Sequence, residues 1–569
     1  MHAFCWFLLQ NMERAESKKE RMLKCMGEEE KRYLQNSEES MEKPIENASV
    51  IGESQPEENT TTSTVKKKSL IILVAVLAAL IVVGSFLLVK GKGGTTATGT
   101  DNVAIKAKIT TDGTAYIPLY NGKTIEIQGD VQKAWLTKNK KRVITLQKDG
   151  TLYVTDLNQS EKNVIADNAT DIISVRDDGI IYEDEAQKAY RVVFKDFSVV
   201  ELGEDISVVV ASHTLSALYA TGKGDIYILA ADKNEANKVD TFDYQVRLKD
   251  ISDDGKLAVW TDKKGSDYRV VLNVSGESTT LGKVTPTYSQ DYTSVFFTKD
   301  QKMAVISSSL SDHLWIKQEG KDVVDVNLGA TLATNAVYTQ DGDLSESNAT
   351  SISALYVKTE GNSEGNLYRI TLTGERDRVV SGVGNFEVIE GKVFYTNADD
   401  NLYYAQLNGT DLKEEEKIAS DVSLFEVEGN GKYVYYVKDS GALYCYKTGE
   451  KEPVKIAAEV ATLYGIITYN RYSADGSTVF YYTELEDIKE TYDDYGTLMM
   501  WSYGESESTK ISSEVLTSTM SSGLKTGAID KNCFTFLKYD SVNSKGDVCA
   551  NWMYNDGKEN EKIAANVIA

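Results

Sequence analysis

Hydrophobic and polar residues alternate along most of the chain in short runs. Residues 134–167 show the pattern: the runs AWLT, RVITLQ, TLYVTDL and KNVIAD are rich in β-branched and aromatic residues, and polar turns separate them. Such runs are typical of short strands joined by tight turns. The segment therefore predicts four antiparallel strands within one unit of about 37–45 residues, the size of a propeller blade.

The third run belongs to a motif that recurs through the chain. KDGTLYVTDLN at residue 148 has counterparts in KGDIYILAADK at 223, EGNLYRITLTG at 364, DDNLYYAQLNG at 399 and SGALYCYKTGE at 440. The aromatic positions are Tyr116, Tyr153, Tyr190, Tyr227, Tyr268, Trp315, Tyr368, Tyr403 and Tyr444, with Met499 and Cys549 in two weaker units. The first four are each 37 residues apart. This recurrence predicts an all-β chain of about eleven four-stranded propeller units, with the aromatic residue packed between neighbouring blades; an open β-solenoid is the main alternative fold.

Eleven units exceed the four to eight blades of a typical single propeller. We therefore expect two rings, with units 1–6 in residues 103–330 and units 7–11 in residues 331–569. One large ring with extensions is the alternative. The first unit lacks one strand, and IAANVIA at the C-terminus is a candidate to supply it.

A second motif, Ser-x-Asp followed by a turn and an apolar strand, occurs in SDDGKLAVWTD at 252, SQDYTSVFFTK at 289 and SADGSTVFYYT at 473. We expect it at blade openings, where Ser and Asp bond the turn backbone and Gly255 and Gly476 adopt positive φ. The motif resembles the Ser-Pro-Asp-Gly opening of TolB-like propeller repeats, although no copy has the proline. The NLYR and NLYY units resemble propeller-like repeats of membrane-anchored proteins from Gram-positive bacteria. The resemblance covers residues 103–566 and implies a propeller with extracellular binding or scaffolding; it transfers no catalytic residue.

Residues 69–89 are predicted to form a transmembrane helix. Leu70 to Val89 are twenty apolar or small residues without a charge, and at ~1.5 Å per residue they span ~30 Å, the thickness of a bilayer core. Three lysines precede this segment and two follow it, which favours a cytoplasmic N-terminus. Residues 1–68 then form a partly disordered cytoplasmic tail, and residues 90–102 a flexible spacer. The rest lies outside a plasma membrane that we expect to be that of a Gram-positive bacterium.

The formal net charge is −24. The tail and the lysines beside the predicted helix cancel, so this charge belongs to residues 93–569. It argues against nucleic acid as a partner, because phosphate binding needs clustered Lys and Arg. The simpler interpretation of this charge is a well-solvated surface. The more specific interpretation is that the charge attracts divalent cations or basic polymers.

No catalytic motif is present. The sequence contains no GxSxG, HExxH or GxxxxGK[ST]. After the predicted helix the only histidines are His213 and His313, which we interpret as surface or core residues. We therefore name no catalytic, cofactor-binding or metal-ligating residue, and expect that the chain is not an enzyme.

Two lengthened loops and the cysteines are the remaining candidates. Glu484 to Gly496 (ELEDIKETYDDYG) contains six carboxylates and one lysine. We interpret it as a solvated insertion, with Ca²⁺ or partner contact as the alternative. Thr339 to Ser351 is the second insertion. Cys533 and Cys549 fall on successive predicted strands, so they either pair or remain buried thiols; Cys445 has no evident partner.

The sequence thus favours a membrane-anchored, extracytoplasmic propeller. We expect it to act as a non-catalytic binding or scaffold module for protein, glycan or cell-wall polymer through its blade loops. The alternative is a propeller enzyme that acts on carbohydrate with a carboxylate pair.

Overall fold

The structure is a computed structural model. It describes residues 104–118, 124–158, 161–265, 267–284, 293–308, 311–332, 337–344, 352–359, 365–461, 471–473, 475–489, 491, 493–517 and 534–568. All described residues belong to the second of the chain's two units, Thr96–Ala569. The predicted tail, transmembrane helix and spacer therefore lie outside the described residues.

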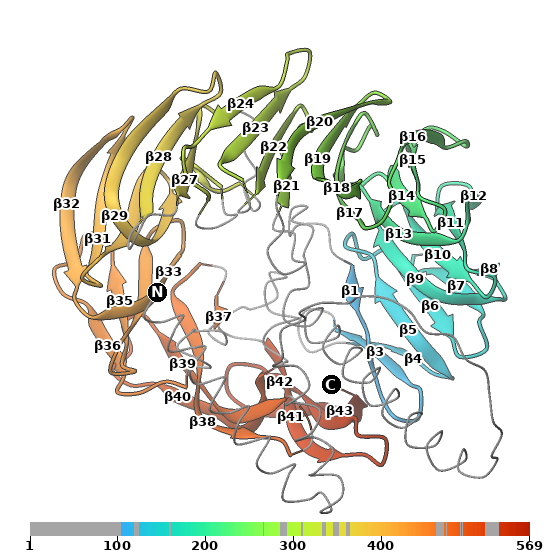
Figure 1. Ribbon diagram of the computed structural model, residues 1–569. Coiled ribbons are helices and arrows are strands. Elements are labelled where there is room, and N and C mark those ends of the chain that lie inside the picture. The colour runs from blue at the N-terminus through green and yellow to red at the C-terminus, as the bar shows by residue number, and fades with distance from the viewer. Residues whose placement is uncertain are drawn as a thin grey trace, which may run out of the picture. The chain divides into compact units, whose positions relative to one another are not determined.

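Short antiparallel strands make up the second unit, and they follow one another in chain order (Figure 1). The first sheet has five strands: β1 (Ile105–Lys106), β5 (Val131–Leu136), β6 (Arg142–Gln147), β7 (Leu152–Asp156) and β8 (Glu161–Ala166). A separate three-stranded sheet contains β2 (Lys108–Ile109), β3 (Ala115–Pro118) and β4 (Thr124–Ile127). Four four-stranded sheets follow: β9 (Ala169–Arg176), β10 (Gly179–Asp184), β11 (Lys188–Val193) and β12 (Ser198–Glu204); β13 (Ile206–Ala211), β14 (Ala217–Thr221), β15 (Asp225–Leu229) and β16 (Asn237–Thr241); β17 (Val246–Ile251), β18 (Leu257–Lys264), β19 (Asp267–Val274) and β20 (Glu277–Val284); β21 (Thr293–Phe297), β22 (Met303–Ser308), β23 (His313–Gln318) and β24 (Val324–Asn327).

The later sheets are less regular. An eight-stranded sheet contains β25 (Tyr338–Thr339), β26 (Gly342–Asp343), β27 (Ala354–Thr359), β28 (Gly365–Thr371), β29 (Arg376–Ile389), β30 (Lys392–Asn397), β31 (Leu402–Asn408) and β32 (Asp411–Ala419). It is followed by β33 (Val422–Glu428), β34 (Tyr433–Lys438), β35 (Leu443–Lys447) and β36 (Val454–Ala457). The last sheet contains β37 (Arg471–Tyr472), β38 (Thr478–Asp487), β39 (Asp494–Ser502), β40 (Thr509–Leu516), β41 (Phe534–Val542), β42 (Val548–Asn555) and β43 (Asn560–Ile568).

The predicted four-stranded unit is confirmed. The four runs of residues 134–167 correspond to β5, β6, β7 and β8, which pair in that order. First strands of neighbouring sheets contact each other, as β13 does with β9 and β17, and the sheets fan out from them (Figure 1). Each sheet is covered on both faces, so second strands such as β14 and β22 are buried at every residue. This is propeller-type packing.

The eight-stranded sheet joins two of these units through one long strand. β29 pairs with β28 through its first half and with β30 through its second half, and register shifts interrupt both ladders. In the last sheet, β40 pairs with β41 only between Val515 and Lys538. After residue 337, therefore, the sheets no longer correspond one to one with four-stranded units. The repeat in the sequence also lengthens there.

The recurring aromatic residue has the predicted place. Tyr153, Tyr190, Tyr227 and Trp315 lie on β7, β11, β15 and β23, each the third strand of four consecutive strands. Tyr190, Tyr227 and Trp315 join hydrophobic clusters built from two neighbouring sheets. These positions are packing positions, as the periodicity predicted.

The Ser-x-Asp turns form as expected but in a different place. Ser252 Oγ donates to Asp254 Oδ1 at 2.9 Å and accepts the Leu257 N–H at 2.9 Å, and Gly255 has φ +69°. Ser473, Asp475 and Gly476 repeat this geometry. Both turns follow the first strand of a unit, so the expectation that they open a blade was wrong. In the β21–β24 sheet the equivalent turn begins at Thr298; the expected copy at residue 289 lies outside the described residues.

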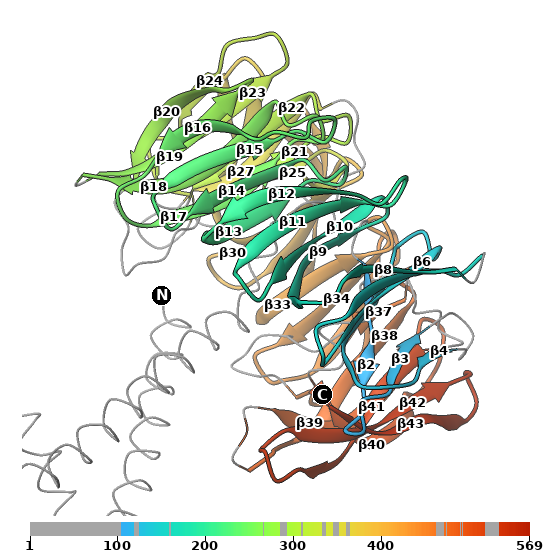
Figure 2. The same ribbon diagram turned by 90° about the vertical axis from the view of Figure 1, so that its right-hand side faces the viewer.

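The two ends of the described unit meet. Thr110, beside β2, forms a β-bridge with Val567 on β43, and the Thr111 N–H donates to the Asn566 carbonyl at 3.1 Å. β43 pairs along its length with β42, so it is the outer strand of the last sheet. The C-terminal run therefore reaches the first unit through one bridge rather than as a full strand of it. Figure 2 shows β2 and β41–β43 in the same region.

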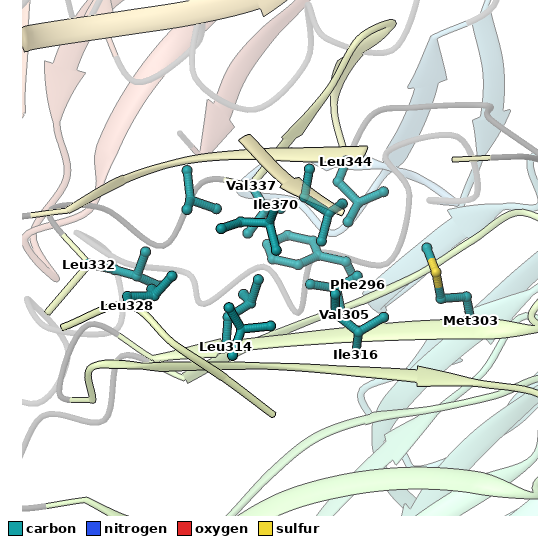
Figure 3. Close-up of a cluster of buried hydrophobic side chains, with 13 residues drawn as sticks. Phe296, Met303, Val305, Leu314, Ile316, Leu328, Leu332, Val337, Leu344 and Ile370 are labelled. Carbon is teal, nitrogen blue, oxygen red and sulfur yellow. The ribbon is translucent and has the colours of Figure 1, made fainter. Parts of the chain in front are cut away.

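A hydrophobic cluster crosses the boundary predicted at residue 330. Leu314 and Ile316 of β23 pack with Leu332 and Val337 beyond it, and with Ile370 of β28 (Figure 3). Dehydration of such side chains stabilises the fold by roughly 25 cal/mol per Å². The sheets on either side of residue 330 thus share one core.

Among the described residues there is no helix with the length and apolar composition needed to cross a bilayer.

Candidate functional site

A cavity of about 500 Å³ lies between the β17–β20 and β21–β24 sheets. Leu281, Gly282 and Lys283 of β20 form one wall. The other wall consists of Ser311, Asp312, His313, Trp315, Asp325, Ala330 and Thr331. Its volume is within the range of about 300–1,000 Å³ that is usual for small-molecule sites. It is the larger of the two cavities that we describe.

Strand geometry brings His313, Trp315 and Asp325 onto one face. Alternate residues of a strand point to the same side, so His313 and Trp315 of β23 are neighbours. Their rings stack with centroids 6.0 Å apart and planes 13° apart. Asp325 of β24 is the register partner of Trp315. The side chains of His313 and Asp325 are therefore diagonal neighbours.

Both nitrogens of the His313 ring face carboxylates. Nδ1 lies 2.6 Å from Asp325 Oδ1, and Nε2 lies 3.5 Å from Asp312 Oδ1. Ser311 Oγ accepts the backbone N–H of His313 at 3.1 Å. This differs from a Ser-His-Asp triad, in which the second ring nitrogen faces the serine. The arrangement fixes the imidazole and presents carboxylate oxygens at the cavity.

Trp315 is the most deeply buried aromatic residue that lines the cavity. It is 2% exposed, and its Nε1–H is buried without a hydrogen-bond partner. A Cβ at Gly282 would lie 3.8 Å from Cε2 of Trp315, the carbon bonded to Nε1. Cζ2 and Cη2 would lie closer, at 2.7 and 3.2 Å, so the benzene edge of the indole faces Gly282.

His213 lies elsewhere, in the turn after β13. Its backbone N–H donates to Asp253 Oδ1 at 3.0 Å, and its Nδ1 lies 3.5 Å from the same oxygen. Asp253 belongs to the turn of the next sheet and accepts Ser216 Oγ on its carbonyl at 2.8 Å. His213 thus joins neighbouring turns, in agreement with a structural role.

A second cavity, of about 310 Å³, is lined mainly by apolar residues of β9 and β13, together with Trp135 and Arg176. The guanidinium of Arg176 donates to the carbonyls of Ala211 at 2.9 Å and Ser212 at 3.1 Å. This arginine therefore caps backbone groups of the next sheet.

Asp250, on β17, is 2% exposed, and burial raises its pKa to about 8.

Where β29 packs beside β33, the charges of two glutamates on one strand act on the pKa of a glutamate on the other. Burial raises the pKa of Glu387 well above its usual range, and the negative charges of Glu426 and Glu428 raise it further. Glu387 is on β29, and both other residues are on β33. The sequence offered no signal for this group, because the three residues come together only where the two strands pack.

The acidic segment 484–496 extends a hairpin. Glu486 pairs in register with Tyr495 and accepts its hydroxyl at 2.7 Å, and Glu484 accepts the Thr497 hydroxyl at 3.1 Å. Among the described residues, no three His, Cys, Asp or Glu side chains converge as metal ligands would. Calcium binding by this segment stays a prediction. In the other insertion, Thr339 and Gly342 pair between β25 and β26, and residues 345–351 lie outside the described residues.

Cys445 and Cys549 are buried free thiols. Burial raises the pKa of Cys445 to about 12 and also raises that of Cys549. Neither is therefore a reactive thiolate near neutral pH. Cys533 lies outside the described residues.

The sequence interpretation missed two features. Tyrosines of second and third strands stack across the hairpin in four sheets: Tyr182 with Tyr190, Tyr219 with Tyr227, Tyr395 with Tyr403, and Tyr436 with Tyr444. A Tyr-x7-Tyr spacing was visible in each case. The His313 site had a weaker signal, HxW on a strand followed by an aspartate, because its walls come from two sheets.

No protein-family profile and no curated protein matches the chain. Several solved structures match the chain. The tricorn protease matches with a TM-score of 0.25 and 11% identity over 80% of this chain and 49% of that one. A study of two prolyl endopeptidases provides a match with a TM-score of 0.29 and 13% identity over 68% and 54%. The Cps50 (Swd1) β-propeller domain of Myceliophteria thermophila matches at 0.25 and 10% over 49% and 96%.

The chain spans about half the length of the first two of these structures. Both are structures of enzymes, and this finding corrects the expectation that the chain is not an enzyme. A missing catalytic motif in the sequence does not exclude activity, because catalytic groups can come from distant strands. At these identities and TM-scores, no activity, substrate or partner is carried over to this chain. The resemblance to TolB-like repeats stays a prediction.

Proposed function

We propose that the chain is a membrane-anchored, extracytoplasmic binding protein of propeller type that takes its ligand in the cavity beside His313. One observation carries the proposal. His313 is held between Asp312 and Asp325 at the wall of an open cavity of about 500 Å³ between two sheets. Concave sites with a few fixed polar groups are the usual places of ligand binding.

The predicted anchor supports an envelope location. Residues 70–89 are apolar throughout, and lysines 66–68 precede them. With the N-terminus in the cytoplasm, residues 96–569 face the outside, where protein, glycan or cell-wall polymer are the available partners. The charge of −24 makes nucleic acid a poor partner.

A single closed series of sheets is the architecture that we propose for this unit, in place of two rings. The Thr110–Val567 bridge joins its ends, and the cluster of Leu314, Leu332 and Ile370 crosses the predicted division at residue 330. Neither feature is expected of two separate rings.

The binding proposal is tested with the full chain in lipid nanodiscs, incubated with fractionated envelope polymers and proteins. We expect one fraction to be retained, and Asp325→Ala to reduce its retention at least tenfold. Asp253→Ala is the matched control, because it removes the other carboxylate that faces a histidine. Equal retention by all three proteins would overturn the assignment of the cavity as the ligand site.

The orientation is tested by cysteine labelling in intact cells. Tyr244 is 69% exposed, so Tyr244→Cys should gain labelling by a membrane-impermeant maleimide over the wild type. Cys25, in the predicted tail, should react only after permeabilisation. The reverse pattern would contradict the proposed topology.

A second candidate is an enzyme that acts on carbohydrate, and the Glu387 group favours it. Glycoside hydrolysis uses one protonated and one ionised carboxyl group, and a carboxyl with a raised pKa beside other carboxylates meets the first need. Incubation with a glycan panel should then show cleavage that Glu387→Gln and Glu426→Gln each abolish. Cleavage by neither wild type nor variants would remove this candidate.

A further inference from the structure

We propose that the cavity beside His313 binds a lysine side chain of a peptide or protein partner, and this inference rests on the proposed binding function. Two carboxylates, Asp312 and Asp325, line the cavity. Their side chains are 48% and 50% exposed, so a ligand can reach both. An ionised carboxylate accepts hydrogen bonds and cannot donate them. A ligand that bonds to these two groups must therefore be a donor.

The donors of the cavity wall already have partners or are buried. Lys283 and Thr331 each have an interaction within the protein. Ser311 is buried, and so is the Nε1–H of Trp315. An anion, or a sugar whose hydroxyl groups need donors as well as acceptors, would leave acceptors unmatched at this wall.

The charge of the site favours a cation. Two carboxylates and one lysine are among the lining residues, and the formal net charge of the chain is −24. Such a field raises the local concentration of cations and speeds their association. An ammonium group also matches the accepting wall, because it offers three donors and no acceptor.

The contacts of His313 favour an ammonium group over a guanidinium. Nδ1 lies 2.6 Å from Oδ1 of Asp325, and Nε2 lies 3.5 Å from Oδ1 of Asp312. Each carboxylate therefore has only Oδ2 left for a ligand. Bidentate binding of arginine needs both oxygens of one carboxylate, whereas the compact ammonium of lysine can bond to single oxygens.

Apolar groups beside the carboxylates suit the stem of a lysine. Leu281 and Ala330 line the cavity and are partly exposed, and the ring of His313 stacks on Trp315. The methylenes of a lysine can lie on such a surface while its ammonium group stays hydrated or bonded. A metal ion has no such stem, and among the described residues no three His, Cys, Asp or Glu side chains converge as metal ligands would.

The test uses the full chain in lipid nanodiscs and isothermal titration with blocked tripeptides. Their central residue, between two alanines, is lysine, acetyl-lysine or arginine, and a glucosamine disaccharide is the amino-sugar probe. We expect the lysine peptide to bind, and the arginine peptide and the disaccharide to bind several-fold more weakly. The acetyl-lysine peptide should bind about tenfold more weakly, because acetylation removes the charge.

Asp325→Asn keeps the shape of the side chain and removes its charge, so it should weaken the lysine peptide about tenfold. Asp253→Asn is the matched control, because it removes the same charge at the other histidine–aspartate pair, and it should leave the affinity unchanged. A thermal melt of each variant checks that it is folded. Equal losses in the two variants would show that only the overall charge attracts the peptide, and would overturn the site.

The retained envelope fraction gives a second readout. Acylation of its amines with acetic anhydride, or digestion with a protease, should abolish its Asp325-dependent retention. Tighter binding of the arginine peptide, the acetyl-lysine peptide or the disaccharide would overturn the lysine assignment. So would failure of the lysine peptide to bind, or retention that survives acylation or protease; if that retention still depends on Asp325, the proposed function stands. Loss of both retention and peptide binding overturns both.

Discussion

A Cβ atom at Gly282 would lie 2.7 Å from Cζ2 of Trp315, so the indole packs directly on the glycine backbone of the neighbouring sheet. Gly282→Ala therefore forces the buried ring to move. Overpacking of this kind costs about 1–3 kcal/mol, which urea denaturation should show. Thr280→Ala, at an exposed position of the same strand, is the control and should change the free energy of unfolding by less than about 0.5 kcal/mol. Equal effects of the two substitutions would contradict the close packing.

The C-terminal strand should stabilise the whole unit. Val567 is fully buried and forms the bridge to Thr110. Deletion of Ala564 to Ala569 removes this contact and part of β43, so the melting temperature should fall by several degrees.

Point variants distinguish the loss of the bridge contact from the effect of shortening the chain. Val567→Ala should cost about 1–3 kcal/mol, and Ile568→Ala less, because Ile568 is 38% exposed. An unchanged melting temperature after the deletion would show that the contact between the ends contributes nothing.

The stacked tyrosines are not equivalent. The Tyr219 hydroxyl is buried and donates to the Leu202 carbonyl at 2.5 Å, whereas the hydroxyl of its stacking partner Tyr227 lies 3.5 Å from Asp225 Oδ2. Tyr219→Phe keeps the ring and removes one hydrogen bond, so it should cost about 1 kcal/mol in a urea titration. Tyr227→Phe should cost less. The reverse order would mean that the stacking, rather than the hydrogen bond, distinguishes the two positions.

Asp250 should make stability depend on pH. Burial raises its folded-state pKa to about 8, while its ordinary value is 3.8. Between these values the unfolded chain releases the proton and the folded chain keeps it, so this group lowers stability as pH rises from about 4 to 8. The slope is at most about 1.4 kcal/mol per pH unit.

Asp250→Asn removes this effect and keeps the Oδ1 acceptor for the Ile251 N–H, which bonds at 2.8 Å. Relative to the wild type, the variant should thus gain stability from pH 5 to pH 8, as measured by urea denaturation at each pH. Parallel profiles of the two proteins would contradict the raised pKa.

Much of the fold was predictable from local sequence. The period of 37 residues located the first units, and the four runs of residues 134–167 became β5 to β8. The role of Tyr190, Tyr227 and Trp315 as packing residues followed from their recurrence. These predictions succeeded because strand formation and turn chemistry depend on neighbouring residues, as at Ser252 and Gly255. The placement of that turn at a blade opening was wrong, because β17, the first strand of its sheet, comes before it.

The candidate sites were decided by tertiary structure. Gly282 and Trp315 are 33 residues apart in sequence and belong to different sheets, so nothing local predicts that one lies on the other. The carboxylate group around Glu387 likewise arises where β29 packs beside β33. The sequence by itself determined the repeat, its strands and the residues of each packing layer. Only the packing of sheets decided which polar side chains share a cavity, because that depends on the distance and angle between units, which the hydrophobic period does not encode.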